Sequence, residues 1–435
     1  MGPLALHLSL RPSRLRRNLF LDMTSWAGIG VTTTLLGALL PASLRTAGMD
    51  PLGLALLAAL PFAAAALSIL AGRLGPRSPR ALGLTRFVGA AALGVALVPM
   101  GSPWLAMLGA AVFWLTLMMG MPLQQRLWGS MYPEERRGRL LGIVTTGRYT
   151  AAALALALGG LLAIRLDEMA VIALGGAVGA ACALAGWRFT TVEPRGTGAF
   201  SARAAVASVV RHPFLRKLTI AHALWGGGLI ASTPLVVLVQ IDRLGLSVAE
   251  VGWIAMAGVI ATMGSLFLWG SLADRRGGLL VIQVGGLLTV LAILLYAVAE
   301  TPLTVAAGTV LVGLAVAAAE VAVPLLVVSR TASDGHAPAT AGMNALLGLR
   351  GIFVPLLAIA PVQAGLTDVR TTLLICAVVS GLGLLVYVAI ALAESPARPA
   401  WLPGPSWRPR MGRVTPVAAG GAVLSSIGAR FASLR

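Results

Sequence analysis

Four ionisable residues stand out inside the long apolar runs of this 435-residue chain, where an ionised side chain is costly and invites a functional explanation. They are Asp22, Arg148, Glu320 and Arg350. A carboxylate in such a run can take up and release a proton, and a guanidinium can bind a carboxylate or a phosphate. We therefore treat these four residues as candidates for substrate contact or ion coupling.

The apolar runs around these charges have the length of membrane-spanning helices. Hydrophobic residues make up 58% of the chain and charged residues only 11%, which is more apolar surface than a water-soluble protein can bury. A helix needs about 20 apolar residues to cross a bilayer. The sequence predicts an all-α membrane protein with twelve transmembrane helices, at residues 19–42, 50–72, 81–99, 103–125, 140–164, 169–189, 215–240, 248–271, 279–299, 302–328, 339–364 and 369–393.

The basic residues indicate which ends of these helices face the cytoplasm. The net charge is +18, but Lys and Arg lie in short clusters between apolar runs, which is typical of membrane topology and not of a nucleic-acid-binding face. Twenty-seven of the 33 basic residues fall in the tails and the loops on one side, including Arg86 with the loop 73–86, and four fall in the alternate loops. We expect both termini in the cytoplasm and a bacterial-type inner membrane.

The chain divides into five predicted segments. The first apolar run is too long for the core of a signal peptide, so we expect it to remain as the first helix. The segments are a cytoplasmic N-terminal tail at 1–18, a six-helix bundle at 19–190, a cytoplasmic linker at 191–213, a second six-helix bundle at 214–393, and a cytoplasmic, disordered tail at 394–435.

The two predicted bundles repeat one another at a nearly constant offset in sequence. Parallel six-helix repeats are one way in which transporters are built, with the substrate site near the membrane midplane between the repeats. The repeat therefore predicts two pseudo-symmetric bundles with a site between them. The matched pairs include Trp26 with Trp225, Pro122 with Pro324, Arg148 with Arg350, and Asp167 with Asp368.

The loop between the eighth and ninth predicted helices carries a recognisable motif. It reads GSLADRRGG from residue 270 to residue 278. This resembles the loop signature of the major facilitator superfamily, at the position that the family uses, and the resemblance covers residues 19–393. It implies the fold of that family and transport by alternating access.

The resemblance also implies a role for this loop as a cytoplasmic gate between the bundles. Its residues there are Gly270, Asp274, Arg275 and Gly277. A carboxylate is stabilised at a helix N-terminus, and pseudosymmetry would place Asp274 near the start of helix five, at Arg136 to Arg139. The first-half copy of the motif has Pro76 where the second has Asp274, which implies a weaker first gate.

The depth of each buried charge follows from its distance along its helix. At 1.5 Å per residue, Arg148, Glu320 and Arg350 lie roughly 13 Å from the cytoplasmic helix ends. Glu320 and Arg350 stand at one level on consecutive helices, so they could form a structural ion pair, or Glu320 could be a proton-titrating switch. The side chain of Arg148 either contacts an anionic or polar ligand or extends towards water.

The remaining candidates have both structural and functional interpretations. Asp22 lies roughly 6 to 8 Å deep, so it either takes part in coupling or sits near the interface beside Arg16 and Arg17. Trp26 and Trp225 occupy matching places in helices one and seven, which line the cavity in the family that the chain resembles. Either Trp can pack beside its neighbouring Gly or contact a ligand. The scattered Cys and His residues have no metal-ligand spacing, so we expect neither a metal nor another cofactor.

The leading hypothesis is a secondary active transporter that exports a small organic solute, with protons as a candidate coupling ion. An exchanger or uptake permease for an organic anion is the alternative that Arg148 and Arg350 motivate. A transport-inactive membrane sensor or scaffold with the same fold is a third possibility. The sequence contains no phosphate-binding loop of the type that ATP-driven pumps use, and no cluster of catalytic groups. We expect a small-molecule substrate, contact with membrane lipid, no nucleic acid and a monomer.

Overall fold

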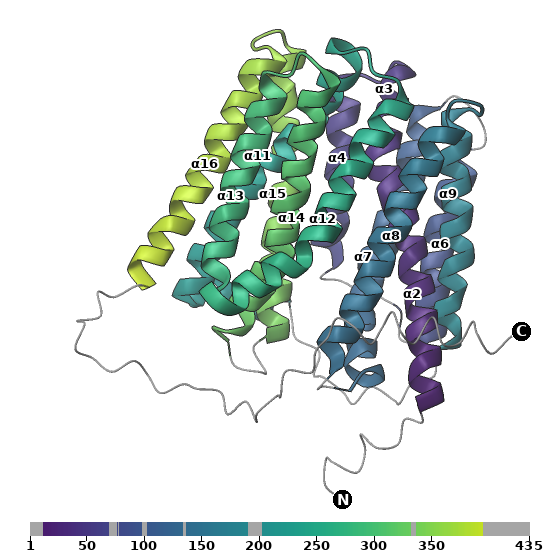
Figure 1. The fold of residues 1–435 in the computed structure, drawn as a ribbon, viewed down its shortest axis with the longest axis vertical. Coiled ribbons are helices and arrows are strands. Elements are labelled where there is room, and N and C mark those ends of the chain that lie inside the picture. The colour runs from purple at the N-terminus through teal and green to yellow at the C-terminus, as the bar shows by residue number, and fades with distance from the viewer. Residues whose placement is uncertain are drawn as a thin grey trace, which may run out of the picture. The chain divides into compact units, whose positions relative to one another are not determined.

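A computed structural model describes most of the chain (Figure 1). The described residues are 12–68, 76, 78–97, 102–133, 136–189, 202–331 and 336–394. Within them the regular elements are all helices, as the sequence predicted. The predicted C-terminal tail lies outside the described residues, apart from its first residue, Glu394.

The first half of the chain forms six transmembrane segments. The first runs through α2, a short π-helical turn and α3 without a break. The elements of this half are α2 (Pro12–Thr34), η1 (Leu35–Leu39), α3 (Leu40–Thr46), α4 (Pro51–Leu67), α6 (Pro79–Leu97), α7 (Pro103–Met131), α8 (Arg137–Leu162), α9 (Glu168–Ala183) and η4 (Leu184–Arg188).

The second half repeats this arrangement after a linker helix. Its elements are α10 (Ala202–Arg211), α11 (Pro213–Leu238), η5 (Val239–Arg243), α12 (Val248–Arg276), α13 (Gly278–Ala297), α14 (Pro302–Val328), α15 (His336–Gln363) and α16 (Val369–Glu394). Eleven helices in the described part of the chain are long and apolar enough to span a membrane. The twelfth predicted span is α4, which is apolar and has 17 described residues.

The linker between the halves contains a helix that the sequence did not reveal. Helix α10 lies inside the predicted linker, and its side chains Ala205 and Val209 are almost completely buried. Gly342 of α15 has no room for a side chain because the backbone of Ala205 lies directly against it. The end of the linker is therefore packed onto the second half.

Two residues of the sequence repeat have the same structural role. Asp167 accepts hydrogen bonds from the backbone N–H groups of Met169 and Ala170 at 2.9 and 3.1 Å, and so caps the start of α9. Asp368 accepts one from the N–H of Thr371 at 2.6 Å at the start of α16. A carboxylate satisfies N–H groups that the first turn of a helix leaves unpaired. This explains why both halves carry an aspartate there.

The apolar core shows how the halves meet. We call the end where α2 begins, at the bottom of Figure 1, the basal end, and the opposite end, which holds loop 244–247, the apical end. One core cluster contains Leu39 and Leu54 from the first half together with Leu235 and Val251 from the second. Towards the basal end the buried residues instead form one cluster within each half.

The helices that join the halves pass close to one another at glycines. A Cβ on Gly348 of α15 would lie 3.0 Å from the carbonyl oxygen of Phe62 in α4, and one on Gly252 of α12 would lie 3.6 Å from that of Leu156 in α8. Absence of a side chain permits such backbone approach. In the described chain the two halves are thus tightly packed from the apical end to the middle of the helices and are less joined at the basal end.

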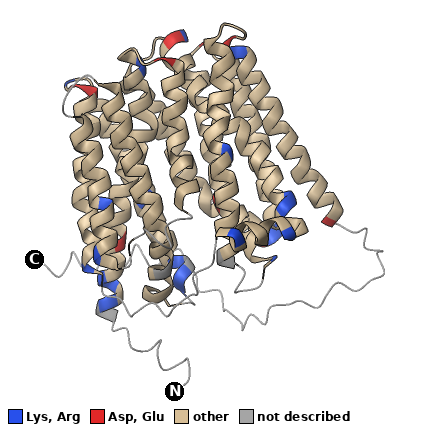
Figure 2. Cartoon of the chain, turned by 180° about the vertical axis from the view of Figure 1, so that it is seen from behind, with Lys and Arg blue, Asp and Glu red and all other residues tan. Residues whose placement is uncertain are grey.

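An ion pair also joins the halves at the apical end. Arg45 donates to both carboxylate oxygens of Asp242, at 2.7 to 3.1 Å. Gln363 of the second half reaches Asp50 of the first at 3.4 Å. Most other Lys and Arg positions of the described chain lie towards the basal end (Figure 2), as the loop count predicted.

We predict that Asp242→Asn weakens apical closure. Both partners are partly exposed, 23% for Arg45 and 40% for Asp242, so water screens the pair and its loss should shift the conformational equilibrium by at most about fivefold. Spin labels on Arg139→Cys and Arg276→Cys, at the basal ends of α8 and α12, would report shorter distances. Glu300→Gln, which changes an exposed apical acid outside this pair, is the control, and unchanged distances in Asp242→Asn would contradict the prediction.

Candidate functional site

A tyrosine and a glutamate meet across the two halves, within the membrane-spanning parts of their helices. The hydroxyl of Tyr149, in α8, donates to the two carboxylate oxygens of Glu320, in α14, at 2.7 and 2.8 Å. Tyr149 is buried, whereas Glu320 remains exposed. A hydrogen bond to a carboxylate is stronger than one between neutral groups. The contact therefore links the halves while one side of the carboxylate stays accessible.

The predicted ion pair between Glu320 and Arg350 is wrong. Arg350 instead donates through Nη1 to the backbone carbonyl oxygens of His222 and Ala223 in α11, at 2.7 and 3.2 Å. The only ion pair among the described residues is the apical one. Depth along a helix sets the level of a side chain but not its direction: Glu320 faces α8, and Arg350 faces α11.

Arg148 lies beside the Tyr149–Glu320 contact and is held by aromatic rings. Its Cζ atom is 5.5 Å from the ring centres of both Trp26 and Tyr149. A guanidinium over a ring face is stabilised by about 0.5 to 2 kcal/mol. Its side chain is partly exposed, and no described residue accepts a hydrogen bond from it or pairs with it. Its donors are therefore available to an anionic group.

Asp22 is buried inside the first half of the chain. Its side chain is 0% exposed. The carboxylate accepts hydrogen bonds from Gln124 Nε2 at 3.1 Å, Trp128 Nε1 at 2.8 Å and the Tyr132 hydroxyl at 2.7 Å. Two of these donors lie on α7, and Tyr132 comes directly after its last residue. Asp22 therefore ties the first helix to the fourth, and its carboxylate is enclosed by protein rather than open beside Arg16 and Arg17.

Arg86 belongs to this cluster, although the sequence analysis counted it with a loop. It lies in α6, is 4% exposed, and donates to Ser25 Oγ at 3.0 Å. Its Nε and Nη2 atoms are buried and have no hydrogen-bond partner among the described residues. The signal was present in the sequence, because Arg86 falls inside the third predicted apolar span, 81–99. The tails and loops on the basal side therefore hold one basic residue fewer than the 27 counted from the sequence.

Trp26 is the centre of the cluster in the first half. Its ring stacks on Trp128 at 5.4 Å, and the guanidinium groups of Arg86 and Arg148 each lie 5.5 Å from its centre. Trp26 is only 6% exposed. In this conformation the ring of Trp26 positions two arginines and is too buried for a ligand to contact it.

The matching cluster in the second half has a different composition. Trp225 is 3% exposed and lies 4.9 Å from the ring of His222. His222 Nδ1 is in turn 2.8 Å from the hydroxyl of Tyr387. Arg350 completes the group through its bond to the His222 carbonyl oxygen. The second half has no buried carboxylate here, so the arginine is bonded to helix backbone.

The GSLADRRGG motif at residues 270–278 contains the basal end of helix α12. Helix α12 ends at Arg276, and Gly277 follows with φ +86°, a conformation that favours glycine. Nothing lies within 4 Å of a Cβ built on Gly270. Asp274 is exposed and makes no ion pair with the described residues at the start of α8. The implied gate contact is therefore not formed in this conformation, and the first-half copy at 72–77 lies outside the described residues except for Pro76.

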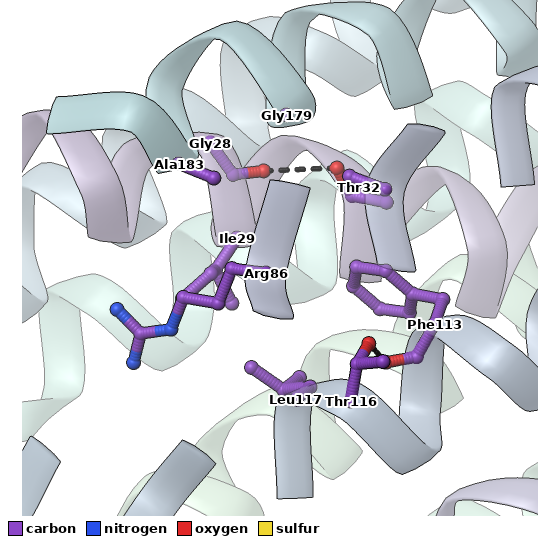
Figure 3. A pocket seen from close by; sticks show the side chains of 10 residues that line it. Gly28, Ile29, Thr32, Arg86, Phe113, Thr116, Leu117, Gly179 and Ala183 are labelled. Carbon is purple, nitrogen blue, oxygen red and sulfur yellow. Dashed lines mark hydrogen bonds between the residues drawn. The ribbon is translucent and has the colours of Figure 1, made fainter. Parts of the chain in front are cut away.

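One cavity of the first half is too small for a substrate. It measures about 10 Å³, the space of one water molecule, and lies between α2, α6, α7 and α9 (Figure 3). Thr32 donates to the Gly28 carbonyl oxygen at its edge, and the guanidinium of Arg86 points away from Phe113. Small-molecule pockets usually measure about 300 Å³ or more. A larger hollow of about 610 Å³ follows α8 past Thr146, Gly147 and Thr150, so we place the candidate site at the seam beside it, around Arg148 and Glu320. The described residues contain no cluster of metal ligands.

We predict that Asp22 and Arg86 act as a unit in the stability of the first half. Asp22→Ala removes a buried carboxylate beside a buried guanidinium and should lower the free energy of unfolding by about 3 kcal/mol. In the double variant Asp22→Ala/Arg86→Met the loss should be smaller than the sum of the single losses. Thermal unfolding in detergent would measure all three variants. Strict additivity would show that the two groups do not interact.

Comparisons with known proteins match the whole helical region. The family model of the Major Facilitator Superfamily matches residues 19–243 and again residues 218–431. A point mutant of the nucleoside transporter NupG superposes with a TM-score of 0.69 at 17% identity, over 86% of this chain and 99% of that chain. An auto-inhibited POT family peptide transporter gives 0.64 at 10% identity, over 90% and 99%. A search of curated proteins finds no match.

Proposed function

The chain belongs to the Major Facilitator Superfamily and is a membrane transporter, and from this premise we propose that it moves a small organic solute through the seam between its two halves. The supporting observation is the meeting of Tyr149 and Glu320 across the halves beside the unpaired guanidinium of Arg148. These groups lie where two bundles that tilt against each other would expose a solute to one side at a time.

The packing of the halves supports an alternating mechanism. A core shared by both halves closes the apical end, while the basal cores are separate. The opposite state would divide the shared core and bring the basal ends together. The Asp274 loop is then a gate that forms only in that second state. On the charge rule we assign the basal end and both termini to the cytoplasm, and the membrane to the inner membrane of a bacterial-type cell.

The proposed direction is export, with a proton as the coupling ion. Glu320 is the group that would carry the proton, because its carboxylate is exposed at the seam and bonded to the opposite half through Tyr149. Protonation would remove the charge that the hydroxyl of Tyr149 stabilises and so weaken the link between the halves. The proposed transporter acts as a monomer.

One alternative rests on a specific observation. Arg148 has no protein partner for its charge in the described chain, which favours a solute with an anionic group and leaves exchange or uptake of an organic anion open. A transport-inactive sensor is the remaining alternative. The structural neighbours are a nucleoside transporter and a peptide transporter, but at 17% and 10% identity they are similar to this chain in fold alone.

We predict that transport requires Arg148 and that coupling requires Glu320. A thermal-shift screen of the purified protein would first identify a solute, whose uptake into liposomes is then followed with and without a pH gradient. Arg148→Ala should abolish transport while the melting profile remains cooperative. Glu320→Gln should still move the solute down its own gradient but no longer respond to the pH gradient.

The controls are a matched arginine and a matched glutamate outside the seam. Arg165→Ala and Glu300→Gln change exposed residues of the apical loops and should transport as the unchanged protein does. Full transport by Arg148→Ala would exclude this seam as the solute path. Proton-driven transport that persists in Glu320→Gln would assign this residue a structural role only. A folded protein that moves no solute would favour the sensor.

A further inference from the structure

Arg148 and Glu320 place opposite charges on the two sides of one tyrosine. Arg148 comes from the first half and Glu320 from the second. The guanidinium lies against the ring face of Tyr149, and the carboxylate is bonded to the hydroxyl of the same residue. No ion pair joins the two charges. Tyr149 therefore acts as a spacer between them.

Closure of the basal end would take both charges out of water. A buried charge without a partner is costly, and breaking one side of a buried pair is strongly unfavourable. A solute with only an anionic group would neutralise Arg148 and leave Glu320 without a cationic partner. A solute with only a cationic group would do the reverse. A solute that carries both groups satisfies both residues at once.

Resting on the proposed transport function, we propose that the seam takes amphoteric solutes, whose carboxylate binds Arg148 and whose protonated amine binds Glu320. Such a solute contacts one residue from each half, so its binding itself draws the halves together. A singly charged analogue contacts one half only and does not favour closure. The substrate class thus follows from the positions of two charges that the protein leaves unpaired with each other.

Matched analogues of one compound test this assignment. L-phenylalanine carries both charges, N-acetyl-L-phenylalanine only the anion, and L-phenylalanine methyl ester only the cation. The same three forms of alanine and of the dipeptide alanyl-phenylalanine extend the set to smaller and longer solutes. Binding to the full-length protein in detergent is measured by thermal shift, and uptake is measured in liposomes. We expect at least one parent compound to bind about tenfold or more tightly than its two singly charged forms.

Two variants assign each charge to its residue. In Arg148→Gln the advantage of the parent over its methyl ester should disappear, and in Glu320→Gln the advantage over the N-acetyl form should disappear. Arg165→Gln and Glu300→Gln should retain both advantages. Three outcomes would overturn the assignment. The unchanged protein could bind a singly charged form as tightly as the parent, neither variant could alter the preference, or no compound of any set could bind. Transport of a neutral or singly charged solute in that case would leave the proposed function standing, whereas a folded protein that moves nothing would remove both.

A second inference comes from independent contacts along α11. The carbonyl oxygens of His222 and Ala223 accept from Arg350 of α15, and that of Trp225 accepts from Ser380 Oγ of α16 at 2.9 Å. These carbonyls precede three consecutive glycines, residues 226–228. Side chains from two other helices therefore supply bonds that remain available if the helical bonds of this turn open.

Only two of the three glycines are explained by packing. A Cβ on Gly226 would lie 2.9 Å from Arg350 Nη1, and one on Gly228 would overlap the carbonyl oxygen of Cys376. A Cβ on Gly227 would meet nothing nearer than 3.8 Å. Glycine weakens a helix interior because it has more backbone freedom to lose. We infer that residues 225–228 form a hinge in α11. Arg350 is the positioning residue that keeps the carbonyl oxygens of His222 and Ala223 hydrogen-bonded while the helix bends.

An alanine scan of two glycines separates a hinge from a packing role. Gly227→Ala fits the space and should leave the melting temperature equal or higher, while it slows transport in liposomes several-fold without weakening solute binding. Gly264→Ala in α12, where a Cβ would have no atom within 4 Å, should have the same effect on stability and leave the rate unchanged. A normal rate in Gly227→Ala would overturn the hinge. Transport by the unchanged protein shows in the same assay that the proposed function holds.

Discussion

The hydrogen bonds from Tyr149 to Glu320 constrain how the two halves can meet inside the membrane. A carboxylate in this setting must be hydrated, protonated or bonded, and here the bond comes from the other half. The same tyrosine places its ring against Arg148. The halves are thus joined through a charged group whose state can change, and any movement at this level alters the surroundings of both charges.

The two repeat-related arginines show how one position acquires two roles. Arg148 and Arg350 occupy equivalent places in α8 and α15, each next to the first helix of its own half. In the first half Trp26 offers a ring face and leaves the guanidinium partly exposed. In the second half a glycine-rich turn of α11 lets the guanidinium reach backbone carbonyls. A side chain whose donors already bond carbonyls has fewer left for a solute, so the pseudosymmetry of the fold does not extend to the chemistry of the seam.

Much of the fold could be predicted from the sequence because lipid imposes simple rules on it. Apolar length, loop charge and the repeat together indicated the helices, and the Asp167–Asp368 match has a physical basis in helix capping. The candidate site was only partly predictable. Depth along a helix placed Glu320 and Arg350 at one level, but the direction of each side chain depends on how helices pack. Tyr149 and Arg86 were overlooked because neither a tyrosine beside a charge nor an arginine near a span boundary looks unusual in sequence.

The closed apical end depends more on packing than on charge. The Arg45–Asp242 pair is partly exposed, and such pairs contribute about 1 kcal/mol or less. The shared core and the glycine contact between α8 and α12 involve many more atoms, each with a small dispersion energy that accumulates. Opening this end therefore needs a compensating gain elsewhere. The basal ends can supply packing when they meet, but only if the charges at the seam are satisfied at the same time. The solute and the proton are the components that can satisfy them, which is how an occupied site could favour the transition that an empty site resists.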